Sequence, residues 1–138
     1  MKGNGMKQAA FVGVMLTVGL VIAADAGKEL EAFQGRWELT ASEKDGTKQP
    51  IGTIRVVKDD TYTIEKDGKT LSKGTIKLDP SASPKTIDIT RAGGKPMLGI
   101  YTLEGDLQKV CFAPEGKDRP KAFSSKDGNT LSEWKKLK

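Results

Sequence analysis

The amino-acid sequence predicts an all-β protein, a small up-and-down antiparallel barrel of about eight strands with a short helical turn at its N-terminal side. Short segments in which apolar and polar residues alternate recur along the chain, which is typical of strands with one buried face. No segment after Phe33 keeps a helical period for long. The expected strands cover residues 37–42, 51–57, 61–65, 70–78, 86–90, 97–103, 107–113 and 130–137.

Turn-forming residues separate these strands. Lys66-Asp67-Gly68-Lys69 carries the strongest hairpin signal, because Asp-Gly suits the positive φ angles of a type I′ turn. In the next strand Leu71 and Ile76 are out of phase for a single face, and Gly74 between them indicates a bulge or bend. A closed barrel would leave no exposed sheet edge, which suits a chain that cannot form an internal disulfide.

The segment around Trp37 is expected to organise the core. Leu30 and Phe33 lie three residues apart in a short amphipathic turn, and Gly35 lets the chain bend from this turn into the first strand. Tryptophan has the largest apolar side chain, so its burial can anchor a small core. We therefore expect Trp37 to be buried at the closed end of the barrel against Leu30 and Phe33.

The last strand gives two further expectations. A basic residue, Lys135 or Lys136, should lie over the Trp37 ring, because a cation is attracted to the face of an indole. Trp134 stands among lysine and glutamate residues. We expect its ring to be partly exposed on this closing strand.

Residues 1–26 have the features of a signal peptide. A basic start precedes an uncharged apolar run at residues 9–24, and Ala24-Asp25-Ala26 offers a cleavage site before Gly27. The apolar run holds 16 residues, whereas a spanning helix needs about 20, so a retained membrane anchor is disfavoured. We expect an exported protein, periplasmic or extracellular, with no stable membrane span after cleavage and one domain at residues 27–138.

The reactive side chains disfavour an enzyme. The chain has no histidine and a single cysteine, Cys111, which excludes histidine-based triads and the usual thiolate or imidazole metal sites. Cys111 lies between Val110 and Phe112, so we expect a small buried side chain with an unreactive thiol. No catalytic residue, metal ligand or cofactor is predicted.

The net charge of +5 comes from lysines and arginines scattered among acidic residues. Nucleic-acid-binding proteins more often carry a basic stripe, or stacking aromatics between basic residues, so we expect no nucleic-acid partner. A loose attraction to an anionic envelope surface or to an envelope protein is compatible with this charge. We expect a monomer.

Four segments carry a resemblance to known families. The run L-E-x-F-Q-G-x-W at residues 30–37 looks like the opening of small lipocalin-like domains. Three further segments resemble an uncharacterised exported domain family that is abundant in planctomycete bacteria. They are L-D-P-x-x-x-P-K-x-I-D-I (78–89), L-G-I-Y-x-L-E-G-D (98–106) and C-F-A-P-x-G-K-x-R-P (111–120). The resemblance implies a calycin-type barrel closed at one end by the N-terminal turn, and it brings no established activity. Analogy with lipocalins implies small, often apolar ligands.

Two of these segments predict a contact between charged residues. Asp88 opposes Ile87 and Ile89 on its strand, and Arg119 lies in a rigid loop between two prolines. We expect Asp88 and Arg119 to fix this loop, either by contacting each other or by separate backbone hydrogen bonds. The alternative is that both side chains are simply exposed.

Two functions fit this sequence. In the first, the barrel binds a small, largely apolar molecule near its open mouth, where Tyr62, Tyr101 and Phe112 converge. In the second, the barrel is filled by its own side chains and the protein is a non-enzymatic interaction or structural module of the cell envelope. An eight-stranded interior is just wide enough for either arrangement. Each strand has two alternating sets of side chains and must turn one of them toward the barrel interior. The sequence leaves that choice open.

Overall fold

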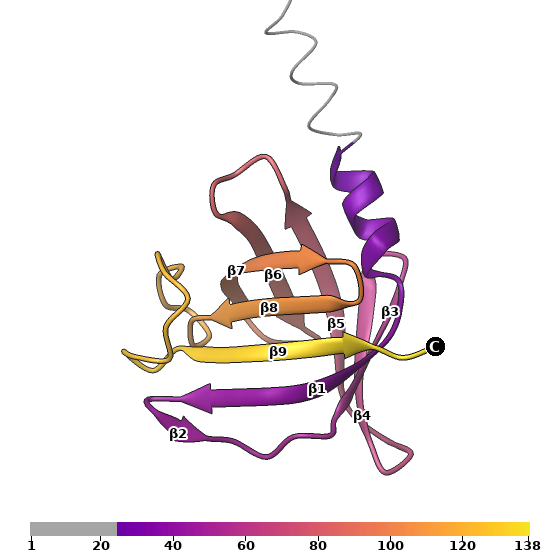
Figure 1. Ribbon diagram of the computed structural model, residues 1–138, viewed down its shortest axis with the longest axis horizontal. Helices are drawn as coiled ribbons and strands as arrows, with labels where there is room; N and C mark the ends of the chain where they lie inside the picture. The colour runs from indigo at the N-terminus through magenta and orange to yellow at the C-terminus, as the bar shows by residue number, and fades with distance from the viewer. Residues whose placement is uncertain (1–24) are drawn as a thin grey trace, which may run out of the picture.

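The computed structural model of the chain describes residues 25–138 and shows a closed antiparallel β-barrel (Figure 1). Eight strands form the wall, and a further strand of two residues pairs with the end of the first. The strands are β1 (Gly35–Lys44), β2 (Thr47–Lys48), β3 (Ile54–Lys58), β4 (Thr61–Lys66), β5 (Lys69–Asp79), β6 (Lys85–Arg91), β7 (Pro96–Glu104), β8 (Leu107–Phe112) and β9 (Thr130–Lys136). The expected signal peptide lies outside the described residues except for its last two positions.

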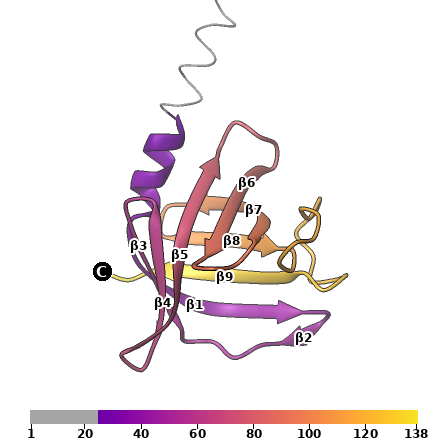
Figure 2. The ribbon, with the colours of Figure 1, turned by 180° about the vertical axis from the view of Figure 1, so that it is seen from behind.

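Each wall strand pairs antiparallel with the next wall strand along the chain, so the barrel has the expected up-and-down order. β1 pairs with β3 through its first residues and with β9 over most of its length, and this second pairing closes the wall. β1 and β9 therefore lie side by side although they are far apart in the sequence (Figures 1 and 2). Within residues 25–138, no helix has the length and apolar character needed to cross a membrane.

The hairpin between β4 and β5 forms where the sequence predicts it. Asp67 and Gly68 have φ angles of 51° and 77°, which is the pair of positive values that a type I′ turn requires. Asp45 and Gly46 turn the chain from β1 into β2 with nearly the same angles, 49° and 76°. The Asp-Gly dipeptide therefore sets two of the turns in the same way.

The irregularity expected in β5 lies at Leu71 and not at Gly74. Consecutive residues of β4 pair with Ser72 and Thr70, so Leu71 is the extra residue in the ladder, and its side chain is 60% exposed. The bulge reverses the phase of the apolar residues that follow it. Gly74 keeps regular pairing, but a Cβ atom there would clash with the backbone oxygen of Thr90. Glycine is needed at this position because β5 and β6 approach closely.

A short helix at residues 25–33 closes one end of the barrel (Figures 1 and 2). Phe33, at the end of this helix, is fully buried, and its ring meets the Tyr101 ring edge to face at a centroid distance of 5.2 Å. The Gln34 side chain ties the helix to the β3–β4 turn. Its amide nitrogen donates to the Asp59 carbonyl oxygen at 2.9 Å, and its amide oxygen accepts from the Asp59 backbone nitrogen at 2.7 Å.

A second tether joins the helix to β6 and β7. The Tyr101 hydroxyl donates to Glu29 Oε2 at 2.8 Å, and Lys85 Nζ lies 2.9 Å from the same oxygen. Burial, together with the hydrogen bond to Glu29 and the charge of that carboxylate, raises the pKa of the Tyr101 hydroxyl. Tyr101 therefore remains protonated and acts as the donor in this contact.

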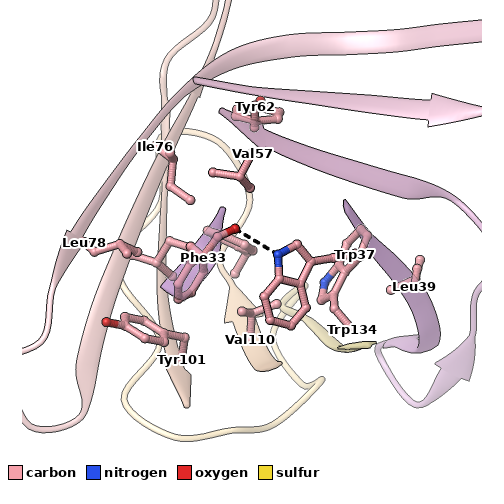
Figure 3. Close-up of a cluster of buried hydrophobic side chains, with 12 residues drawn as sticks. Phe33, Trp37, Leu39, Val57, Tyr62, Ile76, Leu78, Tyr101, Val110 and Trp134 are labelled. Atoms are coloured by element: carbon pink, nitrogen blue, oxygen red, sulfur yellow. Dashed lines mark hydrogen bonds between the residues drawn. The ribbon is translucent and has the colours of Figure 1, made fainter. Parts of the chain in front are cut away.

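Trp37 occupies the position that the sequence predicts. Its side chain is fully buried, and its indole Nε1 donates to the Phe33 carbonyl oxygen at 2.9 Å (Figure 3). Leu30 packs against the same cluster. Lys136 Nζ lies 5.5 Å from the centroid of the Trp37 ring, which confirms the expected cation over this indole. Gly35 has a φ angle of 110° and makes the bend into β1.

The expectation for Trp134 is wrong. Its side chain is only 7% exposed and belongs to the same buried cluster as Trp37. Alternation along β9 explains the difference: Ser132 and Trp134 are buried, whereas Glu133 and Lys135 are exposed. The charged neighbours of Trp134 in the sequence therefore point to the other face and say nothing about the exposure of its ring.

The loop at residues 113–129 covers the outer face of β7 and β8. Cys111 is fully buried beneath it, and its Sγ donates to the Ser124 carbonyl oxygen at 3.2 Å. Burial raises the pKa of the Cys111 thiol. Ile100 is buried too, and it is paired with Cys111 in the ladder. These two side chains pack outside the barrel interior, so the loop covers a small second core.

Arg119 pins this loop to two strands. Its Nη1 donates to Asp88 Oδ1 at 2.7 Å and to the Gly99 carbonyl oxygen at 2.8 Å. The expected contact between Asp88 and Arg119 is therefore present, and a backbone hydrogen bond accompanies it. Both side chains are about one-third exposed, so the pair is neither fully solvated nor deeply buried.

Replacing Trp37 with alanine should destabilise the barrel by about 3–5 kcal/mol, because it removes the largest fully buried side chain and leaves a cavity. Denaturant unfolding followed by circular dichroism measures the loss. Leu71→Ala is the matched control, since its side chain is 60% exposed and its truncation should change stability by less than about 0.5 kcal/mol. A Trp37→Ala variant that melts within a few degrees of the wild type would show that Trp37 does not anchor the core.

A double-mutant cycle of Asp88→Ala and Arg119→Ala should give a coupling free energy of about 0.5–1.5 kcal/mol, because the pair is charged, hydrogen-bonded and partly shielded from water. Arg119→Ala should be the costlier single change, since it also removes the hydrogen bond to the Gly99 carbonyl. Thermal unfolding of the four proteins measures both quantities. Zero coupling would mean that the backbone hydrogen bonds alone hold the loop.

Candidate functional site

The interior of the barrel is not completely filled by its own side chains. A cavity of about 190 Å³ remains between them. β6 begins at Lys85, beside the helix, so Arg91 at its other end marks the end of the barrel away from the helix. Arg91 lines the cavity, which therefore faces that open end. The lining side chains are Arg55, Tyr62, Ile64, Ser72, Ile89, Arg91, Met97, Val110, Phe112, Ser132 and Trp134.

The walls of the cavity come from the inward-facing set of each strand. On β7 this is the set that includes Met97 and Tyr101, and on β8 it is the set with Val110 and Phe112. Gly99 occupies the inward position between Met97 and Tyr101. A Cβ atom there would lie 2.6 Å from the Phe112 ring, so glycine leaves the space in which this ring forms part of the wall.

Arg55 is the most unusual side chain of the interior. It is only 3% exposed, its guanidinium carbon lies 4.3 Å from the centroid of the Trp134 ring, and its Nη2 donates to Gln108 Oε1. Burial lowers the pKa of Arg55 to about 10, so the group is still charged at neutral pH. None of the carboxylates in residues 25–138 forms an ion pair with it. The barrel therefore holds a buried positive charge without a counter-charge.

Three buried nitrogen atoms around this charge have no hydrogen-bond partner within the described part of the chain. They are Arg55 Nε, Gln108 Nε2 and Trp134 Nε1. Each of them is a hydrogen-bond donor, and leaving such a group unpaired costs about 1–3 kcal/mol. Two of the three side chains, Arg55 and Trp134, line the cavity. The interior thus presents more donors than the barrel satisfies.

Two further polar groups lie nearer the mouth. Tyr62 is 4% exposed, and burial raises the pKa of its hydroxyl, although the positive charges of Arg91 and Arg55 act in the opposite direction. Tyr62 is therefore neutral and can donate or accept a hydrogen bond. Arg91 is exposed, and its Nη2 lies 3.3 Å from Glu115 Oε2.

The structure brings together two of the three aromatic residues expected at the ligand site. Tyr62 and Phe112 line the same cavity. Tyr101 does not line it, because its hydroxyl is held by Glu29 at the helix end of the barrel. Figure 3 shows Tyr62 and Tyr101 on opposite sides of the buried cluster. Alternation places Tyr101 on the inward face, but its level along the barrel depends on the register between strands.

Arg55 and Gln108 are the residues that sequence reasoning missed. Neither residue is singled out by composition, because charged and amide side chains are mostly exposed. The available signal was alternation: Arg55 stands two residues before Val57, and Gln108 two residues before Val110. Once Val57 and Val110 are known to face inward, the two polar residues must face inward as well.

Within residues 25–138, no group of three or more histidine, cysteine, aspartate or glutamate side chains is placed to hold a metal ion. No protein-family model, curated protein sequence or solved structure matches the chain. The site is therefore interpreted from its own side chains.

The double variant Arg55→Met with Gln108→Leu should be at least as stable as the wild type, because it replaces a buried charge and its amide partner together by apolar groups. Gln108→Leu alone should lower the free energy of unfolding by about 1–3 kcal/mol, since it leaves the Arg55 guanidinium without its hydrogen-bond acceptor. Denaturant unfolding of the two variants tests this. A double variant less stable than Gln108→Leu would show that Arg55 supports the fold itself.

Proposed function

We propose that this protein is an exported carrier or sensor that binds one small, largely apolar ligand inside the barrel. The supporting observation is the interior cavity, which combines an apolar wall with a few buried polar groups. That combination is typical of small-molecule sites, in which apolar contacts supply burial and a few polar groups fix orientation. Tyr62 and Phe112 contribute rings to the wall.

The size of the cavity limits the ligand. A volume of about 190 Å³ corresponds to roughly six water molecules, and a cavity of about 150 Å³ is enough to hold benzene. Sites for drug-sized ligands usually measure about 300–1,000 Å³. The proposed ligand is therefore a single ring or a short branched chain, although part of it can extend through the mouth beside Arg91.

A hollow on the outside of the barrel is a weaker candidate. It measures about 480 Å³ and lies in the 113–129 loop. Apart from Arg119, which already pairs with Asp88, its charged members are exposed to solvent and of both signs, among them Lys117, Asp118 and Lys121. Solvated side chains of this kind give little binding free energy, so the interior cavity is the better supported site.

Native mass spectrometry of the protein purified from its own envelope should show one small molecule per chain, and that molecule should raise the melting temperature. Met97→Trp should abolish the adduct, because the larger side chain occupies the cavity that Met97 lines. Met97→Leu is the control, since it keeps the volume nearly constant and should retain the adduct. Consistently bare wild-type protein would contradict the carrier and favour the envelope interaction module.

A further inference from the structure

We infer that the ligand carries a carboxylate, which Arg55 binds at the inner end of the cavity. This inference rests on the proposed function, because it names the chemical class of the molecule that the same cavity would take. It depends on three observations: a buried cation with no ion-pair partner within residues 25–138, unpaired donors beside it, and a mostly apolar cavity wall.

The buried charge is the first step. Moving an isolated cation from water into a protein interior is costly unless the cation is paired, so buried arginines normally contact a carboxylate. Arg55 is 3% exposed, and the groups beside it are neutral: the Gln108 amide oxygen, the Trp134 ring and the nearby Tyr62 hydroxyl. Arginine keeps its charge rather than releasing a proton. A monoanion in the cavity would supply the counter-charge that residues 25–138 do not provide.

The unpaired groups identify what the anion must offer. Arg55 Nε, Gln108 Nε2 and Trp134 Nε1 are all donors, so none of them can satisfy another. A carboxylate has two oxygens with about four acceptor positions and accepts guanidinium donors in a fork. It therefore matches the guanidinium and can also accept from the Trp134 indole, which lines the cavity beside Arg55.

The wall favours a carboxylate over a phosphate or sulfate. Most of the lining is apolar, and its other buried or partly buried polar members are neutral hydroxyl groups on Tyr62, Ser72 and Ser132, so Arg55 is the one buried cation among the lining side chains. A phosphate group carries three strong acceptor oxygens and a charge near −2. A monocarboxylate with a small apolar body leaves only one end polar, as the cavity requires.

The mouth of the cavity is also suited to an anion. Arg91 lies there and is the second cation among the lining residues, none of which is acidic. Glu115 pairs with Arg91 from outside the cavity and reduces this positive field without reversing it. A positive entrance raises the local concentration of anions and the rate at which they bind.

Benzoate and benzamide provide a matched pair of probes, because they share one ring and differ in the charge of the substituent. The purified protein should bind benzoate at least roughly tenfold more tightly than benzamide by calorimetry at pH 7, since hydrogen bonds to a charged acceptor are the stronger ones. The preference should disappear in the Arg55→Met, Gln108→Leu double variant. It should persist in Arg36→Met, which removes an exposed arginine paired with Glu65.

The two indole N–H signals of a ¹⁵N-resolved NMR spectrum give an independent readout in the wild-type protein. Trp134 Nε1 is unpaired, whereas Trp37 Nε1 already donates to the Phe33 carbonyl oxygen. Benzoate should therefore shift the Trp134 signal and leave the Trp37 signal almost unchanged. Equal shifts of both signals, or of neither, would contradict binding at Arg55.

The results separate this inference from the proposed function. Equal affinity for the two probes, with both displaced by Met97→Trp, would overturn the carboxylate while leaving the interior site in place. Binding of neither probe would overturn the carboxylate as well. If native mass spectrometry also showed no bound molecule on the protein purified from its own envelope, the proposed carrier function would be wrong as well. If the molecule that co-purifies with the protein were neutral, the inference of a carboxylate ligand would be wrong, but the carrier function would still stand.

Discussion

The packing of Phe33 and Trp37 is the interaction on which the rest of the structure depends. The two rings lie 6.2 Å apart, and the Trp37 indole donates to the Phe33 carbonyl oxygen, so the helix and the first strand are joined inside the core. This contact closes one end of the barrel with apolar side chains. The interior cavity lies toward the other end. The position of the candidate site is thus a consequence of how the chain enters its first strand.

Much of the fold could be predicted from local patterns, because alternation and Asp-Gly turns are properties of a few neighbouring residues. The eight wall strands, the β4–β5 hairpin and the burial of Trp37 are of this kind. Features that depend on register could not be predicted. The bulge at Leu71 and the separation of Tyr101 from Tyr62 depend on how paired strands align, and the burial of Trp134 depends on which alternating face of β9 its partner strands turn inward.

The residues of the candidate site also differ in how far the sequence could predict them. Tyr62 and Phe112 could be predicted because aromatic residues on alternating strands are ordinary wall residues. Arg55 could not, because a buried arginine contradicts the general preference of charged side chains for water. Such a residue weakens the fold at the place where it stands. Natural proteins keep destabilising groups of this kind chiefly where function requires them, so Arg55 supports the proposed binding site more strongly than the apolar wall does.

The pairing of β1 with β9 has a consequence for how the chain folds. The barrel cannot close until its last strand has been synthesised, because β9 pairs with both β8 and β1. Until then, β1 and β8 present unpaired edges that can join other chains. Contacts between residues so far apart in sequence also slow folding to the range of about milliseconds to seconds. The chain is therefore most vulnerable to aggregation, and most open to chaperones, before its final strand is in place.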